Sequence, residues 1–330
     1  MSVDQALSKA KSYLKKDEFA EAQKLYQAVL LNFPQNIRAQ QGLALLNNHN
    51  KKIDMIKIPP QEEIDHLINL HNTGQLSDVV KKAQVLSEQY PDDFIIWNIL
   101  GISSIQIGLL DKAIAAYKKC LFINPNYADA YKYTGIALKN MGKLEEALDS
   151  FKKFTSLKPN NTQAYFEIGN TLKDLGIVNE AIEAYKKCIS LKPDYAEAYN
   201  NMGIALRIIG KFDKAIEAYK RAICLKPNYA EAYCNKGNAL QDECNLENAI
   251  KAYKKSLSLK PNCPVTYKNM GNTLLKQGKI NEAIKVCNKC ISLKPDYAEA
   301  YKNMGSCLKE QDKIDEAITA YSKALSIKPD

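Results

Sequence analysis

Apolar residues recur along this chain at the spacing of amphipathic helices, and the whole pattern repeats every 34 residues. The clearest copy, residues 196–229, predicts two helices with Gly210 between them. Pro227 is predicted to end the second helix, because proline cannot continue a helix. The apolar stripe of the first helix and that of the second follow the same i, i+4, i+7 spacing and contain, in chain order, Tyr199, Gly203, Leu206, Ala215, Tyr219 and Ala222.

The repeat is regular enough to be numbered, with Ala196 as repeat position 1 and Tyr229 as position 34. Position 8 holds Gly101, Gly135, Gly169, Gly203, Gly237, Gly271 and Gly305. Position 20 holds Ala113, Ala147, Ala181, Ala215, Ala249, Ala283 and Ala317. Position 32 holds Pro91, Pro125, Pro159, Pro193, Pro227, Pro261, Pro295 and Pro329. A period between 20 and 50 residues indicates a solenoid of stacked units, in which each unit contacts its neighbours.

The glycine at position 8 stands in the middle of a predicted helix, where glycine costs about 1 kcal/mol relative to alanine. Close packing is the expected compensation. Gly203 is predicted to let its helix lie against the turn that contains Ala215, with aromatic rings at the flanks.

The start of each first helix carries a capping pattern. Asn228 is followed three residues later by Glu231, which predicts an N-cap with an acidic partner in the first turn. The same arrangement recurs at Asp194 and Glu197, Asp296 and Glu299, and Asn126 and Asp129.

The combination of Tyr199, Gly203, Ala215, Tyr219, Ala222 and Pro227 resembles the tetratricopeptide repeat. This resemblance implies an all-α fold, a right-handed superhelical solenoid of helix-turn-helix repeats. The segments NNMG at 200–203 and LKPDYAEAY at 191–199 are similar to the repeats of O-GlcNAc transferases and of bacterial proteins with such arrays.

The repeat pattern divides the chain into three parts. Residues 1–46 are predicted to hold an irregular repeat, 3–36, and a lone helix, 37–46. Residues 47–60 lack a helical stripe and end in two prolines, so they are predicted to be a linker. Residues 61–330 form the array, with one irregular unit at 61–93 and seven regular units at 94–330.

The last unit ends directly after Pro329, and its final helix would present an apolar face formed by Ile318, Tyr321 and Leu325. Terminal repeats usually have a polar outer face. Either this helix mediates self-association, or the chain is a piece of a longer protein; the second explanation is favoured.

The residue types needed for catalysis are not brought together by the repeat. No glycine belongs to a phosphate-binding loop between a strand and a helix. His49, His66 and His71 are interpreted as surface residues. No catalytic, cofactor-binding or metal-binding residue is therefore predicted.

Several of the nine cysteines follow the repeat. Cys120, Cys188 and Cys290 all occupy position 27, where a buried thiol can act as a small apolar residue. Cys287 and Cys290 form a C-x-x-C, but on a helical core stripe, without the βαβ context of a redox site or a second pair for zinc. They are predicted to pack in the core. The chain shows no secretion signal and no apolar run of membrane-spanning length, which favours a cytoplasmic protein with reduced thiols.

The resemblance implies that positions 2, 5, 6, 9 and 12 line a concave groove. Position 6 holds an asparagine ladder, Asn201, Asn235, Asn269 and Asn303, similar to the ladder of O-GlcNAc transferases. An asparagine amide can donate to and accept from a peptide backbone of any sequence. Ile99, Tyr133 and Glu167 replace it in the preceding units, so the ladder covers the C-terminal half. Alternatively, the asparagines are repeat consensus without a binding role.

Basic residues accompany the ladder at positions 5 and 12, namely Lys132, Lys139, Lys173, Arg207, Lys268, Lys302 and Lys309. The acids at position 2, Asp129, Glu197, Glu231 and Glu299, are expected to be engaged in capping. With a formal net charge of +9, the groove is predicted to prefer acidic, extended peptides. Exposed aromatic and arginine clusters for nucleic acid are missing. Lys268, Asn272 and Asn303 also match three of the five residues of the carboxylate clamp in chaperone-binding tetratricopeptide domains.

The predicted function is a non-catalytic scaffold that holds an extended protein segment in this groove. One alternative is the substrate-recognition arm of a larger glycosyltransferase or sulfotransferase. Another is an assembly module that acts through its terminal helix.

Overall fold

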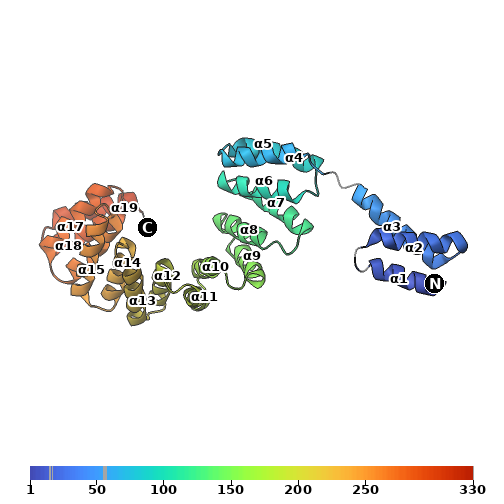
Figure 1. Ribbon diagram of the computed structural model, residues 1–330. Helices are drawn as coiled ribbons and strands as arrows, with labels where there is room; N and C mark the ends of the chain where they lie inside the picture. Colours follow the sequence, from blue (N-terminus) through green and yellow to red (C-terminus); the bar gives the residue numbers. More distant parts are fainter. Residues whose placement is uncertain (15, 17, 55–57, 330) are drawn as a thin grey trace. The chain divides into compact units, whose positions relative to one another are not determined.

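The structure, a computed structural model, describes the chain except residues 15, 17, 55–57 and 330, and it leaves the side chains of 47–54 undescribed. Its described residues form nineteen α-helices and no strand, so the predicted all-α fold is confirmed (Figure 1). The chain forms two compact units, Met1–Pro125 and Asn126–Asp330, which are described in turn.

The first unit contains seven helices: α1 (Val3–Leu14), α2 (Phe19–Asn32), α3 (Ile37–Asp54), α4 (Gln61–Asn72), α5 (Leu76–Gln89), α6 (Phe94–Gln106) and α7 (Leu110–Ile123). Helices α1, α2 and α3 share an apolar cluster around Ala10, Ala22 and Tyr26. A separate cluster around Leu67, Val79 and Ile96 joins α4 to α6, together with Ala116 of α7.

Helix α3 is longer than the sequence pattern predicted. The lone helix was expected to end at residue 46, but it continues to Asp54, inside the predicted linker 47–60. The added segment contains neither glycine nor proline. Since adding a residue to an existing helix needs no new nucleation, such a segment can remain helical without an apolar stripe.

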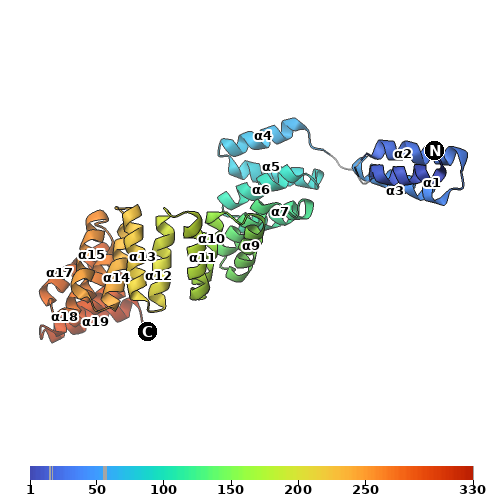
Figure 2. The ribbon, with the colours of Figure 1, turned by 60° about the horizontal axis from the view of Figure 1, so that its bottom comes forward.

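The second unit contains six helix pairs: α8 (Ala128–Asn140), α9 (Leu144–Leu157), α10 (Thr162–Asp174), α11 (Val178–Leu191), α12 (Ala196–Ile208), α13 (Phe212–Leu225), α14 (Ala230–Asp242), α15 (Leu246–Leu259), α16 (Pro264–Lys276), α17 (Ile280–Leu293), α18 (Ala298–Lys309) and α19 (Ile314–Ile327). Each pair corresponds to one predicted 34-residue unit. The pairs stack side by side along a curve (Figures 1 and 2), with α10, α12 and α14 on its inner side and α11 and α13 on its outer side.

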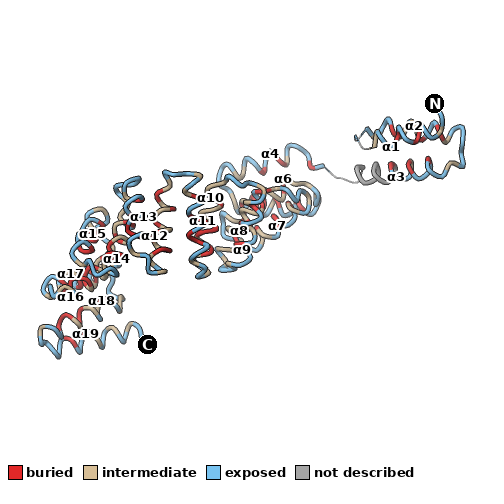
Figure 3. The backbone as a smooth tube through the Cα atoms, turned by 90° about the horizontal axis from the view of Figure 1, so that it is seen from below, coloured by how far each residue is buried: buried red, intermediate tan, exposed pale blue. Residues whose placement is uncertain are grey.

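The core lies between the helices of each pair and between neighbouring pairs, where the buried segments of the backbone face one another (Figure 3). Ala215, Tyr219 and Ala222 of the predicted stripe are fully buried. A Cβ atom on Gly203 would lie 2.6 Å from the ring of Tyr219. The glycine therefore makes room for this aromatic ring itself, and not for the turn at Ala215 as predicted.

The predicted N-caps are wrong. Helix α12 has Tyr195 as its N-cap, and no side chain caps it; α8, α14 and α18 likewise begin after a tyrosine at position 34. Asp93 and Asn161, which occupy position 34 in their units, do cap, accepting bonds from the amides of Ile96 (2.9 Å) and Ala164 (3.0 Å). The predicted capping residues stand at position 33, one residue too early.

The turn between the two helices of a unit requires a left-handed backbone at position 15. Six units place a glycine there, with φ between 73° and 78°. Cys244 and Asp312 occupy the same position with φ of 61° and 60°. A side chain in this conformation costs roughly 1–2 kcal/mol per residue, a penalty that glycine avoids.

Replacing Cys244 or Asp312 by glycine is expected to stabilise the chain by about 1 kcal/mol, since relief of the left-handed conformation exceeds the added entropy of the unfolded glycine. The urea midpoint of unfolding measures the change. Gly210→Ala, at the same position in another unit, should lower that midpoint. If both substitutions to glycine lower it too, the turn is not strained.

Candidate functional site

The residues predicted to line a groove all lie in the second unit, on the first helix of each pair, namely α8, α10, α12, α14, α16 and α18. Three of these helices lie along the inner side of the curve in Figure 1. The hydrogen bonds and ion pairs of these residues divide this helix face into two parts, one on α8 to α14 and the other on α16 and α18.

Each asparagine of the ladder donates its amide to the preceding unit. Two of the four acceptors are asparagines at position 9, one is an asparagine at position 5, and one is a backbone carbonyl. The bonds run from Asn201 to Asn170 (2.8 Å), from Asn269 to Asn238 (2.7 Å), from Asn235 to Asn200 (3.1 Å) and from Asn303 to the carbonyl oxygen of Lys268 (3.2 Å). The ladder thus links consecutive units by hydrogen bonds.

Asn200 is a structural residue that the sequence analysis missed. It is fully buried, donates to Oδ1 of Asn201 (3.3 Å) and accepts from Asn235 (3.1 Å). Its position 5 next to a ladder asparagine is the signal that could have revealed it. A buried amide of this kind costs free energy unless its hydrogen bonds are made, so its bonds hold the two units in register.

A second internal use of the asparagines involves the tyrosine at position 24. The hydroxyl of Tyr185 donates to Asn170 (2.8 Å), and that of Tyr253 donates to Asn238 (2.9 Å). In the unit of Tyr219 the corresponding residue is Ile204, and the buried hydroxyl has no hydrogen-bond partner among the described residues. Desolvation by burial raises the pKa of Tyr219. The pairing of positions 9 and 24 could have been found in the sequence.

Three of the predicted groove cations are already paired. Lys139 contacts Glu167 (2.9 Å), Lys173 contacts Asp174 (2.9 Å), and Arg207 contacts Asp242 (2.7 Å). Lys132 lies over the ring of Tyr133, 4.8 Å from its centroid. These contacts reduce the free positive charge on α8, α10 and α12.

The predicted capping acid Glu197 has a different partner. It accepts a hydrogen bond from Lys226 (2.9 Å), which lowers the pKa of the carboxyl group. The expected role of Glu197 in capping is therefore corrected to an ion pair within its own unit.

The groups on α16 and α18 differ from those before them. In the part of the chain that the structure describes, the side chains of Lys268, Asn272, Lys302 and Lys309 make no ion pair or hydrogen bond. Asn272 has Cys287 opposite it at position 24, so no tyrosine hydroxyl reaches it. Together with Asn303, these residues are called the α16–α18 cluster.

The interpretation of the histidines as surface residues holds for His66 but not for His71. His66 is exposed, and His49 lies outside the described side chains. His71 is half-buried, with Nδ1 3.0 Å from Oγ of Ser103. Ser103 is fully buried, so this pair connects α4 to α6 and offers no accessible nucleophile.

The cysteines at position 27 pack in the core as predicted. Cys120, Cys188 and Cys290 are fully buried, and desolvation raises their thiol pKa values to about 12, about 11 and about 11. No cluster of metal-ligating side chains occurs among the described residues. None of the helices described is both long and apolar enough to cross a membrane.

Comparison with known proteins agrees with the fold. Solved structures with similar folds include PilF of Pseudomonas aeruginosa (20% identity, TM-score 0.54, covering 61% of this chain and 92% of that one). The Cut9–Hcn1 assembly of the APC/C is also similar (16% identity, TM-score 0.56, 99% and 74% covered). YrrB, described as a TPR protein with an unusual peptide-binding site, shares 20% identity over 55% of this chain and 93% of that one, with a TM-score of 0.46.

Family models give the assignment. No curated protein matches the chain. Models described as "Tetratricopeptide repeat" or "TPR repeat" match residues 7–54, 95–127, 135–161, 169–207, 205–243, 230–263, 264–297 and 298–330, well over half of the sequence. The chain, with its stacked helix pairs and periodic glycine, alanine and proline, therefore belongs to the tetratricopeptide repeat family.

Proposed function

We propose that this chain is a scaffold that binds an extended, acidic protein segment along the inner face of its second unit. The α16–α18 cluster is the principal contact. The observation that carries the proposal is the contrast along this face. Most polar groups of α8 to α14 are bound to one another, while Asn303 is the one member of the cluster whose side chain is bonded within the described residues.

The physical reason is competition. A ligand carboxylate that approaches Lys139 or Arg207 must displace the acidic partner that each already has. A ligand carboxylate displaces only water from the ammonium groups of Lys268, Lys302 and Lys309. The hydrogen bonds that then form between ammonium and carboxylate are charge-assisted and are among the stronger ones. The amide of Asn272 can both donate to and accept from a peptide backbone, which requires no particular ligand sequence.

Fluorescence anisotropy with a labelled peptide of about a dozen residues, rich in Glu and Asp, tests this proposal. The variant Lys268→Ala/Asn272→Ala/Lys302→Ala is expected to bind about tenfold or more weakly, a loss of about 1.4 kcal/mol. Lys139→Ala/Lys173→Ala, which removes two paired cations, is the matched control and should change the affinity less than about threefold. Binding to the wild type should weaken at high salt.

Equal losses in the two variants would show that the cluster has no special role. An affinity independent of salt would remove the electrostatic part. The same contacts would serve a substrate-recognition arm, and extending the reading frame beyond residue 330 would reveal any glycosyltransferase domain.

A further inference from the structure

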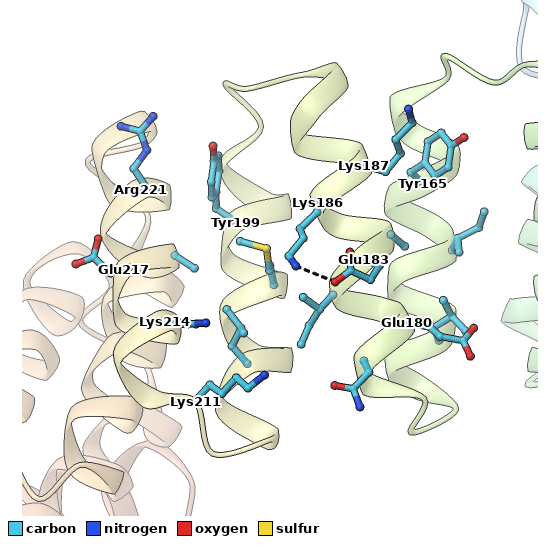
Figure 4. A pocket seen from close by; sticks show the side chains of 18 of the residues that line it. Tyr165, Glu180, Glu183, Lys186, Lys187, Tyr199, Lys211, Lys214, Glu217 and Arg221 are labelled. Atoms are coloured by element: carbon cyan, nitrogen blue, oxygen red, sulfur yellow. Dashed lines mark hydrogen bonds and ion pairs between the residues drawn. The ribbon is translucent and has the colours of Figure 1, made fainter.

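The outer side of the second unit has a hollow that the proposed peptide site does not use. It measures about 990 Å³ and extends along α11, α12 and α13 to the adjoining parts of α9 and α10 (Figure 4). From α12, Tyr199, Met202 and Leu206 contribute to its floor. These residues lie on the side of α12 opposite to positions 5, 9 and 12, because a helix turns 100° per residue.

The floor of this hollow is apolar and partly accessible. Leu206 and Ile182 are buried, while Tyr199 and Met202 are half-buried and so face the space. Methionine is flexible and polarisable, and it adapts to differently shaped apolar partners. The guanidinium of Arg221 lies 6.0 Å from the centroid of the Tyr199 ring and limits the hollow at one end.

The repeat does not give every hollow an apolar floor. The next hollow along the array, about 600 Å³ over α14, has Lys236 at the position of Met202. Burial, and then the charge of Lys220, lowers the pKa of Lys236. The fold thus accommodates a lysine at position 7, whereas Ile168, Met270 and Met304 are apolar at that position, as Met202 is.

The rim of the hollow carries more available cations than anions. Of its acids, Glu183 is bound to Lys186 (2.8 Å) and Glu217 to Lys220 (3.0 Å), while Glu180 and Asp213 form no ion pair within the described residues. The cations Lys152, Lys187, Lys211, Lys214 and Arg221 are exposed and form no ion pair within the described residues. Lys211 and Lys214 lie toward one end of the hollow and Arg221 toward the other (Figure 4).

We propose that this hollow, called the outer groove, binds an amphipathic helix of a partner protein that has acidic residues beside its apolar stripe. Apolar side chains spaced i, i+3, i+4 and i+7 would contact Tyr199, Met202 and Leu206, the mode by which helices occupy apolar grooves. Carboxylates flanking that stripe would contact the cations at both ends of the hollow. This charge complementarity favours a helix with acidic residues over one with basic residues. This site is independent of the inner face.

The probe is a labelled, alanine-based helical peptide of about 18 residues, with Leu and Met on one stripe and Glu beside it. Anisotropy should show binding to the wild type. Met202→Lys, which copies Lys236, should weaken it about tenfold or more, because the apolar contact is replaced by a charge. Met202→Ala is the second variant, in case the lysine disturbs folding, and should weaken it about threefold or more. Asn272→Ala, on the inner face, is the control and should not change it.

The same peptide with its order scrambled should bind poorly, and one with Lys in place of Glu should bind more weakly than the original. The proposal is overturned if the wild type shows no binding at about 1 mM peptide, or if Met202→Lys and Met202→Ala both bind like the wild type. Equal binding of the scrambled peptide would also overturn it. Ultracentrifugation tests whether the outer groove instead binds a second copy of this chain. A wild-type dimer that Met202→Lys dissociates would support that alternative and overturn the proposal.

Discussion

Gly203→Ala is expected to lower the free energy of unfolding by up to about 2 kcal/mol, although alanine is the better helix former. The added Cβ would lie 2.6 Å from the ring of Tyr219, which is fully buried, so the ring would have to shift within the core. Overpacking of this kind typically costs about 1–3 kcal/mol more than an unstrained core, against about 1 kcal/mol gained in helix propensity. Urea unfolding followed by circular dichroism measures the difference.

The chain supplies its own control at the same repeat position. At Gly271 the residue opposite is Cys287, and a Cβ would lie 3.0 Å from its sulfur. Gly271→Ala should therefore change stability by less than about 1 kcal/mol, since the gain in propensity offsets a small shift of the thiol. If Gly203→Ala and Gly271→Ala have equal effects, the aromatic ring does not explain the glycine.

Asn200→Ala is expected to destabilise the second unit by about 2 kcal/mol. It removes two hydrogen bonds of a fully buried amide and leaves the amide of Asn235 without its acceptor. An unsatisfied buried donor costs about 1–3 kcal/mol. Because a solenoid is stabilised mainly by contacts between neighbouring units, the loss should appear as faster hydrogen exchange in α12 and α14.

Asn272→Ala tests the opposite case on the same face. Its side chain makes no hydrogen bond to the described residues, so stability should change by less than about 0.5 kcal/mol. A loss of stability as large as that of Asn200→Ala would mean that Asn272 has a structural role, and its place in the α16–α18 cluster would have to be abandoned.

Much of the fold could be predicted because the same local sequence pattern recurs in many consecutive units. The stripe of Ala215, Tyr219 and Ala222 and the proline at position 32 determine where helices lie and where they end. Where one local pattern stood alone, it misled. The segment after residue 46 lacks an apolar stripe, yet the helix continues. The capping pattern was displaced by one residue because Tyr195, not Asp194, is the N-cap.

The candidate site was less predictable because its residues are alike in sequence and differ in their contacts. Asn201 and Asn272 both suggested groove amides, but the first donates to Asn170 while the second has no partner among the described residues. Lys139 and Lys268 both suggested groove cations, but the first has Glu167 beside it. Such pairs join residues about 30 positions apart, and local pattern does not show which of them bond.

By itself, the sequence determined the period, the helix pairs, the positions of the buried small and aromatic residues, and which residues share a helix face. Those features depend on interactions within one unit or on burial repeated in every unit. Tertiary structure alone decided which polar side chains bind one another and which remain available, and it formed the apolar floor of the outer groove. The reason is that hydrogen bonds and ion pairs need atoms within about 3–4 Å, and stacking brings them that close.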